Sequence, residues 1–258
     1  MRQINFLVKS RGPAKISTEI IILIILLTAG LVAFTTSHNS MDDQVLAYIV
    51  DTKTQNLQLF WKNDNGEKLK NIQNLITFVE SKNLTLTFAM NGGMFNKDLS
   101  PQGLFIQNSN TLAALDTADG NGNFYLKPNG VFYVTTDNIP FICKTTDFID
   151  NGKIKYATQS GPMLIIDGHI HSAFKADSKN LNIRNGVGIL PDHKLVFAIS
   201  KTAINFYDFA KYFQSRGCKN ALFLDGYISR MYLPEMNCTQ TDGNFGVIIG
   251  VTVPLQKP

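Results

Sequence analysis

The segment ALFLDGYISR, residues 221–230, contains the feature that decides the fold of this chain. Residues 221–224 are uncharged and apolar, as is typical of a buried strand, and Gly226 permits a sharp turn directly after Asp225. The segment therefore predicts a strand whose rigid end holds the Asp225 carboxylate at a crevice. An isolated Asp-Gly pair is also a common turn, so the role of Asp225 depends on the rest of the chain.

Two segments, residues 67–82 and 205–216, have apolar side chains at helical spacing. Asn205 could cap the second helix, and Gly217 could end it. This helix lies directly before the strand that ends at Asp225. A helix-to-strand unit is therefore expected ahead of the carboxylate.

Short strand-like segments dominate the rest of the chain, and turn residues separate them. The predicted strands are residues 45–50, 57–61, 84–90, 123–127, 131–136, 163–167, 195–200 and 246–253. The turns NDNG (63–66), DGNG (119–122) and PNG (128–130) favour hairpins, so neighbouring strands should be antiparallel. The pattern predicts one α+β domain with a large mixed, mostly antiparallel β-sheet core and few helices.

The first 40 residues differ from the remainder and predict a membrane-targeting helix. Four basic residues precede the fifteen uncharged residues 20–34, which places the N-terminus in the cytoplasm and the body outside it, in the periplasm or at the cell surface. The apolar stretch fits a signal peptide, and residues 17–37 together approach the ~20 residues that a membrane anchor needs. A cleaved signal peptide and an uncleaved inner-membrane anchor both remain open, with the anchor slightly favoured.

The body, residues 41–258, is nearly neutral. The first 40 residues contain four of the 24 basic residues and one of the 20 acidic residues, which leaves 20 minus 19, or +1. No cluster of Lys and Arg occurs downstream, so nucleic acid is not an expected partner. About 218 residues without a repeat or linker indicate a single domain. The oligomeric state stays open.

Cysteines and histidines give weaker indications. Cys218 and Cys238 flank the Asp225 segment and could form a disulfide in an oxidising compartment, while Cys143 would remain unpaired. His169 and His171 could share a strand face and bind a metal, but no third ligand is evident, and exposed hairpin histidines are the preferred interpretation. No metal or other cofactor is predicted.

Polar residues also follow the strand at residues 84–90. Asn91 precedes Gly92 and Gly93, which allow main chain to approach a ligand and could expose N–H groups that bind an anion, although a tight turn explains them as well.

Two further segments place polar groups beside apolar strands. Gln159 and Ser160 precede Gly161 and Pro162. Arg184 and Asn185 begin the segment RNGVGI, and a guanidinium matches a phosphate bidentately, although an isolated arginine is more often a surface ion-pair residue.

These segments, in this order, resemble the phosphodiester glycosidase family, which includes N-acetylglucosamine-1-phosphodiester alpha-N-acetylglucosaminidase, and in particular its short bacterial, YigE-like branch. The resemblance covers residues 45–253 and rests on NGGMF with SPQGL (91–104), GNFYLKPNGVF (122–132), ATQSGPMLIIDG (157–168), RNGVGI (184–189), VFAIS with NFYDFAKYF (196–213) and ALFLDGYISRMYLP (221–234). The better-characterised branch reads R-x-A-x-G and LDGG-x-S, whereas this chain has Val187 and Tyr227 at the differing positions. Asn91, Arg184, Asp225 and Ser229 match position for position.

The resemblance implies an exported hydrolase that cleaves a sugar 1-phosphodiester of an envelope or surface glycan. It implies catalytic roles for Asp225, Arg184 and Asn91, with Asp225 as acid/base or nucleophile and Arg184 on the phosphate. Substrate-binding roles fall to Gly92, Gly93, Gln159, Ser160, Gly161, Asn185 and Ser229.

Several alternatives stay open. Glycosidases usually need a second carboxylate, for which Asp116, Asp119, Asp167 and Asp208 are candidates, although each also fits a turn or a cap. The sugar, the bond that breaks and the stereochemical outcome are not determined. The rival hypothesis is a non-catalytic protein that binds glycan or assembles exopolysaccharide, in which Phe95, Tyr207 and Tyr227 could stack on sugars as they could in the enzyme.

Overall fold

The strands of this protein form three antiparallel sheets, seen in a computed structural model that describes residues 41–225 and 228–255. The predicted targeting helix within residues 1–40 lies outside the described residues, as does Tyr227. Among the helices that are described, none has the length and apolar character needed to cross a membrane.

Each sheet combines strands that are far apart in the sequence. The first has the order β1 (Val45–Val50), β12 (Leu195–Ser200), β11 (Asn185–Ile189), β13 (Ala221–Asp225), β9 (Met163–Ile166), β10 (His169–Ile170). The second has the order β15 (Cys238–Thr239), β14 (Met231–Leu233), β3 (Leu84–Asn91), β16 (Ile248–Pro254), β2 (Asn56–Phe60). The third has the order β5 (Asn110–Ala113), β4 (Phe105–Gln107), β8 (Ile154–Ser160), β6 (Gly130–Thr135), β7 (Pro140–Lys144).

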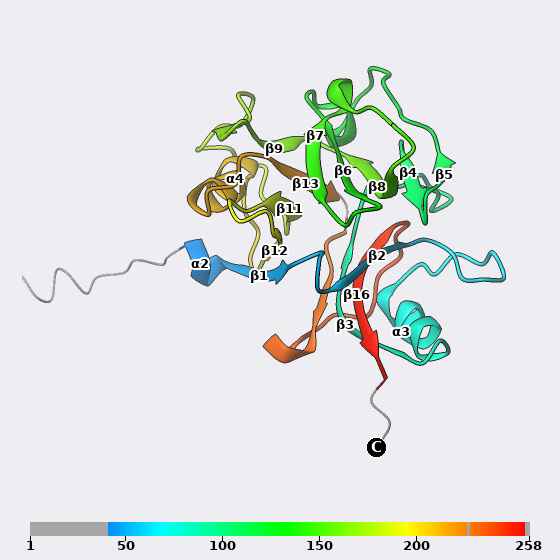
Figure 1. Cartoon of the computed structure of the whole chain (residues 1–258). Coiled ribbons are helices and arrows are strands. Elements are labelled where there is room, and N and C mark those ends of the chain that lie inside the picture. Colours follow the sequence, from blue (N-terminus) through cyan, green and yellow to red (C-terminus); the bar gives the residue numbers. More distant parts are fainter. Residues whose placement is uncertain (1–40, 226–227, 256–258) are drawn as a thin grey trace, which may run out of the picture. The chain divides into compact units, whose positions relative to one another are not determined.

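Three α-helices and three short 3₁₀ helices complete the described chain. The α-helices are α2 (Met41–Gln44), α3 (Ile72–Glu80) and α4 (Phe206–Ser215), and the 3₁₀ helices are η1 (Asn123–Tyr125), η2 (Thr145–Asp147) and η3 (Pro234–Met236). In Figure 1, α3 lies beside β3, and α4 lies beside β9. Asn205 caps α4 through its side chain, and Gly217 follows the helix with a φ of 77°, as the sequence predicted.

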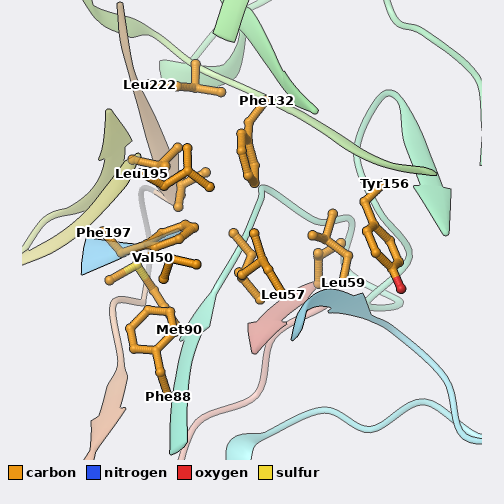
Figure 2. Close-up of a cluster of buried hydrophobic side chains, with 14 of the residues drawn as sticks. Val50, Leu57, Leu59, Phe88, Met90, Phe132, Tyr156, Leu195, Phe197 and Leu222 are labelled. Carbon is orange, nitrogen blue, oxygen red and sulfur yellow. The ribbon is translucent and has the colours of Figure 1, made fainter. Parts of the chain in front are cut away.

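The main hydrophobic core lies where the three sheets meet. Val50 comes from the first sheet, Leu57 from the second and Phe132 from the third, and all three belong to one buried cluster (Figure 2). Phe197 packs against both Phe88 and Phe132, with ring centroids 5.2 and 6.0 Å apart. The three sheets therefore share one core and form one domain, which confirms the predicted fold class.

The structure corrects several local expectations. Residues 123–127 form the 3₁₀ helix η1 and a loop instead of a strand. The helix predicted over residues 67–82 is α3, which begins only at Ile72 because Lys70 has a positive φ and Asn71 is the cap. The core is divided among three sheets, and every strand pair of the described residues is antiparallel.

The structure also decides the question that the sequence left open for the cysteines, and it corrects the expectation that both histidines are exposed. Cys218 and Cys238 are both free thiols; the first is buried beside α4, and the second donates to the Met231 carbonyl at 3.2 Å. His171 is only 3% exposed: its ring stacks on Phe174, Nδ1 accepts from the N–H of Ala173, and Nε2 donates to the Lys127 carbonyl. His169 is exposed, as expected.

Candidate functional site around Asp225

The ends of three strands bring the central polar residues together. Strand β13 ends at Asp225, β11 begins at Asn185, and these two residues are partners in the antiparallel ladder. Asn91 is the last residue of β3 in the second sheet. All three side chains are at least 98% buried, which places a carboxylate and two amides in surroundings of low polarity. The sequence prediction that Asp225 lies at a strand end is confirmed.

Asn91 connects the two sheets through its side-chain amide. Its Nδ2 donates to Asp225 Oδ2 at 2.8 Å and to the Ile228 carbonyl at 2.6 Å. Its Oδ1 accepts from Asn185 Nδ2 at 3.0 Å and from the backbone N–H of Arg230 at 2.8 Å. An amide group offers two donors and two acceptor sites, and here all four are used. This arrangement fixes the orientation of the amide, with its donating nitrogen directed at the carboxylate.

The chain that follows the Asp225 turn is held by a second set of contacts. Ser229 Oγ donates to the Ile183 carbonyl at 3.1 Å and approaches Asn185 Oδ1 at 3.5 Å. The Arg230 guanidinium forms a bidentate pair with Asp242, at 2.8 and 2.9 Å, which raises the pKa of Arg230 and lowers that of Asp242. These contacts fix the position of the Arg230 N–H that binds Asn91.

Asp225 lines a cavity of about 300 Å³. Its remaining lining residues come from the loop after β3 and from the first residue of η1, and they are Met94, Phe95, Asn96, Lys97, Gln102 and Asn123. Within the described part of the chain, Asp225 is the only carboxylate in this lining and Lys97 the only cation. Met94 and Phe95 provide an apolar wall, and the amides of Asn96, Gln102 and Asn123 provide hydrogen-bonding groups. Such a lining suits a small polar ligand with an apolar face, such as a sugar.

Gly92 and Gly93 serve close packing. A Cβ on Gly92 would lie 2.3 Å from Ile249 Cγ1, and one on Gly93 would lie 2.4 Å from Thr158 Oγ1. The N–H of Gly92 donates to the Val247 carbonyl at 2.8 Å. This N–H is therefore not available to an anion, although the sequence suggested that it could bind one. Both glycines are buried, and they let the chain that follows β3 pass close to β16 of the same sheet and to β8 of the third sheet. Met94 and Phe95 then line the cavity.

Gln159 and Ser160 form hydrogen bonds with backbone groups around the site, and Gly161 allows close packing there. Gln159 is fully buried; its Oε1 accepts the N–H groups of Leu104 and Asp116, and its Nε2 donates to the Asp116 carbonyl. Ser160 Oγ donates to the Leu224 carbonyl at 2.9 Å, directly before Asp225. Gly161 is buried, and a Cβ there would meet Asn129 Cβ at 2.6 Å. None of the three lines the described part of the cavity, so their predicted contact with substrate stays a prediction.

Arg184 lies outside the described cavity lining and is only 1% exposed. Two of its three guanidinium nitrogens donate to carbonyls: Nε to Ile204 and Nη2 to Asn180, both at 2.8 Å. The guanidinium carbon lies 3.6 Å from the centre of the Phe206 ring, a cation–π contact that joins the start of β11 to α4. Burial lowers the pKa of Arg184 to about 10. The structure brings Asn91, Asn185, Asp225 and Ser229 together, but it does not bring the Arg184 guanidinium to the cavity.

The four candidates for a second carboxylate have other roles. Asp116 Oδ2 accepts from the Tyr125 hydroxyl, and Asp119 pairs with Lys127. Asp167 is an exposed turn residue with a φ of 50°. Asp208 accepts from the Asn205 amide at the start of α4. None of them lines the described part of the cavity, so Asp225 is the only sequence-derived carboxylate found there.

Lys97, Gln102 and Asn123 line the cavity but were not predicted from the sequence. Phe95, which the sequence suggested as an aromatic residue near the site, does line it. Lys97 belongs to a loop that is anchored from outside, since Trp61 Nε1 donates to the Leu99 carbonyl at 2.9 Å. The loop also closes on itself through the Asn96 N–H, which donates to the Ser100 carbonyl. The segment NKD itself offers no signal of function, because a loop lysine is ordinarily solvated. Tyr207 is half-buried in α4 and does not line the cavity.

Sequence comparison identifies the family of the chain. The chain belongs to the phosphodiester glycosidase family, whose sequence model matches residues 85–251, more than half of the chain. It is similar to the uncharacterized protein YigE of Escherichia coli (strain K12), with 36% identity over 190 residues that cover 73% of this chain and 74% of that protein.

Solved structures show the same fold at low sequence identity. The catalytic domain of zebrafish N-acetylglucosamine-1-phosphodiester alpha-N-acetylglucosaminidase, auto-inhibited by its pro-peptide, has 13% identity and a TM-score of 0.51, over 84% of this chain and 94% of that one. A hypothetical protein from Synechocystis has 14% identity and a TM-score of 0.53, over 81% and 59%. A putative exported protein from Burkholderia pseudomallei K96243 has 10% identity and a TM-score of 0.51, over 80% and 73%. At these identities the likeness concerns the fold.

Proposed function

We propose that this protein is an exported hydrolase that cleaves a sugar 1-phosphodiester of an envelope or surface glycan, with Asp225 as its reactive carboxylate. The observation that carries the proposal is the cavity of about 300 Å³, where Asp225 is held by the Asn91 amide. Family membership supports the reaction class. The cavity lining supports a sugar ligand, because it combines an apolar wall with amide groups.

A single carboxylate is consistent with this substrate class. Glycosidases that act on ordinary glycosides use one carboxylic acid to protonate the leaving oxygen. A phosphate is a far weaker base than a sugar alkoxide, so it can leave without that proton. Asp225 can then take one of two roles: it can accept a proton from the attacking water, or it can attack the anomeric carbon itself.

The buried amides support either role of Asp225. The Asn91 donor stabilises the ionised carboxylate through a hydrogen bond, and the restrained amide keeps the carboxylate in one orientation. Asn185 and Ser229 act on Asn91 and on the segment after Asp225, so we assign them positioning roles. Arg184 directly precedes Asn185, and its contacts with the Ile204 carbonyl and the Phe206 ring hold the start of β11 against α4, so it has the same kind of role.

Turnover of synthetic sugar 1-phosphodiesters tests the proposal. The purified full-length protein is incubated with the methyl phosphodiesters of several sugars, and free reducing sugar is measured. Asp225→Asn should lower kcat by roughly 10²- to 10⁴-fold, as for the loss of an acid–base group. Asp167→Asn is the matched control, because Asp167 also precedes a glycine but is exposed and outside the described cavity lining. No turnover with retained glycan binding would instead support the glycan-binding alternative.

Two further measurements define the reaction. Hydrolysis in water labelled with heavy oxygen places the label in the sugar when the C–O bond breaks and in the phosphate when the P–O bond breaks. Proton NMR of the first sugar product distinguishes retention from inversion, which separates the two roles of Asp225.

The proposed location outside the cytoplasm rests on the basic and apolar pattern of residues 1–40 and agrees with the putative exported protein among the structural relatives. Fusing alkaline phosphatase after residue 258 should give an active periplasmic phosphatase. Carbonate extraction of membranes then distinguishes an anchored protein from a released one. A phosphatase that stays inactive while a cytoplasmic fluorescent fusion is bright would contradict export.

A further inference from the structure

We propose that Lys97 binds the phosphate of the substrate in the cavity beside Asp225. This inference rests on the proposed function and assigns the cation that the reaction needs. Lys97 is the only positively charged residue in the described lining of the cavity. It belongs to the loop between β3 and β4, which also provides Met94, Phe95, Asn96 and Gln102.

The charges in the cavity require such a cation. A phosphodiester carries one negative charge, and it must approach the Asp225 carboxylate closely enough for reaction. Like charges repel strongly where water is partly excluded. An ammonium group between the phosphate and the solvent compensates this repulsion and draws the anion into the cavity.

Lys97 is not committed to a carboxylate elsewhere in the described structure. The ion pairs of the described residues involve other cations. The neighbouring Asp98 accepts hydrogen bonds from the N–H and Oγ of Ser100 and pairs with Lys68 at 3.3 Å. These contacts, with those to Ser100 the largest, lower the pKa of Asp98 to about 2. The acid beside Lys97 in the sequence is therefore bound to other groups.

The loop combines a hydrogen-bonded backbone with an exposed cationic side chain. The Asn96 N–H donates to the Ser100 carbonyl at 2.9 Å, and the Leu99 N–H donates to the Asn96 carbonyl at 2.8 Å. Trp61 holds the Leu99 carbonyl from outside the loop. Lys97 itself is exposed, and its long side chain can follow a phosphate as it changes charge.

Arg184 is the other cation that the sequence suggested for the phosphate. Its Nε and Nη2 already donate to carbonyls, and Phe206 covers one face of its guanidinium. To reach a phosphate in the cavity it would have to give up these buried contacts, each of which would then lose its partner. Lys97 can bind the anion without such a loss.

The function of Lys97 follows from the change in the charge of the phosphate group during the reaction. When the C–O bond is the one cleaved, water adds its oxygen to the anomeric carbon, and the bond from that carbon to the phosphate oxygen breaks. The electron pair of this bond stays on the phosphate, one proton is released, and the phosphate monoester carries more negative charge than the diester did. A cation placed at the phosphate stabilises this growing charge more in the transition state than in the bound substrate.

The test compares three variants of the full-length protein. Lys97→Met removes the charge with little change in length, Lys97→Arg retains it, and Lys153→Met is the control at an exposed lysine outside the cavity lining. Two quantities are measured for each: kcat/KM on the sugar methyl phosphodiester with the highest turnover, and the Kd of inorganic phosphate by calorimetry at low salt. Lys97→Met should lower kcat/KM and weaken phosphate binding by roughly 10- to 100-fold each. Lys97→Arg should recover most of both, and Lys153→Met should match the wild type.

The outcomes separate this inference from the proposed function. Unchanged turnover in Lys97→Met overturns the inference and leaves the proposed function intact. Absence of any turnover in the wild type, together with phosphate binding that depends on Lys97, contradicts the proposed function but supports the anion site. A wild type that does not bind inorganic phosphate at low salt, or binds it equally well as Lys97→Met, overturns the assignment of Lys97.

Discussion

The geometry around Asp225 depends on one residue, Asn91. Its amide contacts Asp225, Ile228, Asn185 and Arg230, and these residues come from two separate regions of the sequence. Removing the amide leaves buried donors and acceptors without partners, which costs more than the hydrogen bonds themselves contribute.

Asn91→Ala should therefore lower the free energy of unfolding by about 2–4 kcal/mol and reduce turnover further than the loss of stability explains. Urea denaturation measures the first quantity, and activity at a temperature where the variant remains folded measures the second. Asn110→Ala, at an exposed position of β5, is the control and should change stability by less than about 0.5 kcal/mol. Equal unfolding free energies for the two variants would contradict the role of Asn91.

His171 makes stability depend on pH. Burial lowers its pKa below the ordinary value near 6.5, although the Lys127 carbonyl opposes part of this shift. The unfolded chain therefore binds the proton more readily than the folded protein does. The contribution of the neutral imidazole is complete above about pH 6.5 and is lost as the pH falls toward the lowered pKa of the folded state.

The wild type should accordingly lose more stability between pH 7 and pH 5 than the variant His171→Gln does. Urea denaturation at several pH values measures the difference, because the carboxylates contribute equally in both proteins. His169→Gln, at the exposed histidine two residues earlier, should keep the pH dependence of the wild type. Parallel curves for the wild type and His171→Gln would contradict the assignment.

At the scale of elements, close contact between β11 and α4 supports the strand that presents Asn185. Gly188 lies in β11, and a Cβ there would approach Phe213 Cδ1 to 2.7 Å and Cys218 Sγ to 2.8 Å. An alanine at this position must displace buried side chains, and overpacking of this kind costs ~1–3 kcal/mol.

Gly188→Ala should therefore be destabilising by about that amount, and Cys218→Ala should recover part of the loss because it removes one of the two obstructing atoms. Chemical denaturation of the two single variants and the double variant gives the coupling energy. The two changes should be less destabilising together than the sum of their separate effects. Strict additivity would show that β11 and α4 are less tightly packed than the structure indicates.

Elements with a strong local pattern could be predicted from the sequence. The apolar run before Asp225 predicted β13 correctly. Asn205 and Gly217 predicted the start and the end of α4. The segment at residues 123–127 has the composition of a strand but forms η1. Its neighbours explain the difference: Asn129 Nδ2 donates to the Phe124 carbonyl, which folds the chain back on itself.

The site could be predicted only in part, for a similar reason. Asp225 and Asn91 follow apolar strands, and this position marked them in the sequence. The uncommitted charge of Lys97 depends on the pairing of Asp98 with Lys68, thirty positions earlier. The burial of Arg184 depends on Phe206, which lies on a different element. Contacts between residues so far apart in the sequence produce no recognisable pattern in the local sequence of either partner.

At the scale of the whole molecule, three sheets enclose one core, and this division could not be read from the sequence. β1 pairs with β12, which lies far from it in the sequence. Such pairing depends on which strand faces are buried, and an apolar strand can pair equally well with several others. The same packing decides the state of the cysteines. Burial raises the pKa of Cys143 to about 11 and that of Cys218 to about 12.

The folded protein should consequently contain three slow-reacting thiols. Labelling with iodoacetamide at pH 8 should be slow in the folded protein, slowest at Cys218, and fast after unfolding, because only the thiolate reacts. Peptide mapping without reduction should recover Cys218 and Cys238 in separate peptides. A disulfide-linked pair of these peptides in freshly purified protein would contradict the structure.

Trp61 gives the molecule a further property. It is the only tryptophan in the chain, and its indole N–H holds the Leu99 carbonyl of the loop that carries Lys97. Indole fluorescence responds to the hydrogen bonding and solvation of the ring, so a ligand that shifts this loop should alter the emission of Trp61. The protein thus contains a built-in optical reporter of its own cavity, with no competing tryptophan signal from elsewhere in the chain.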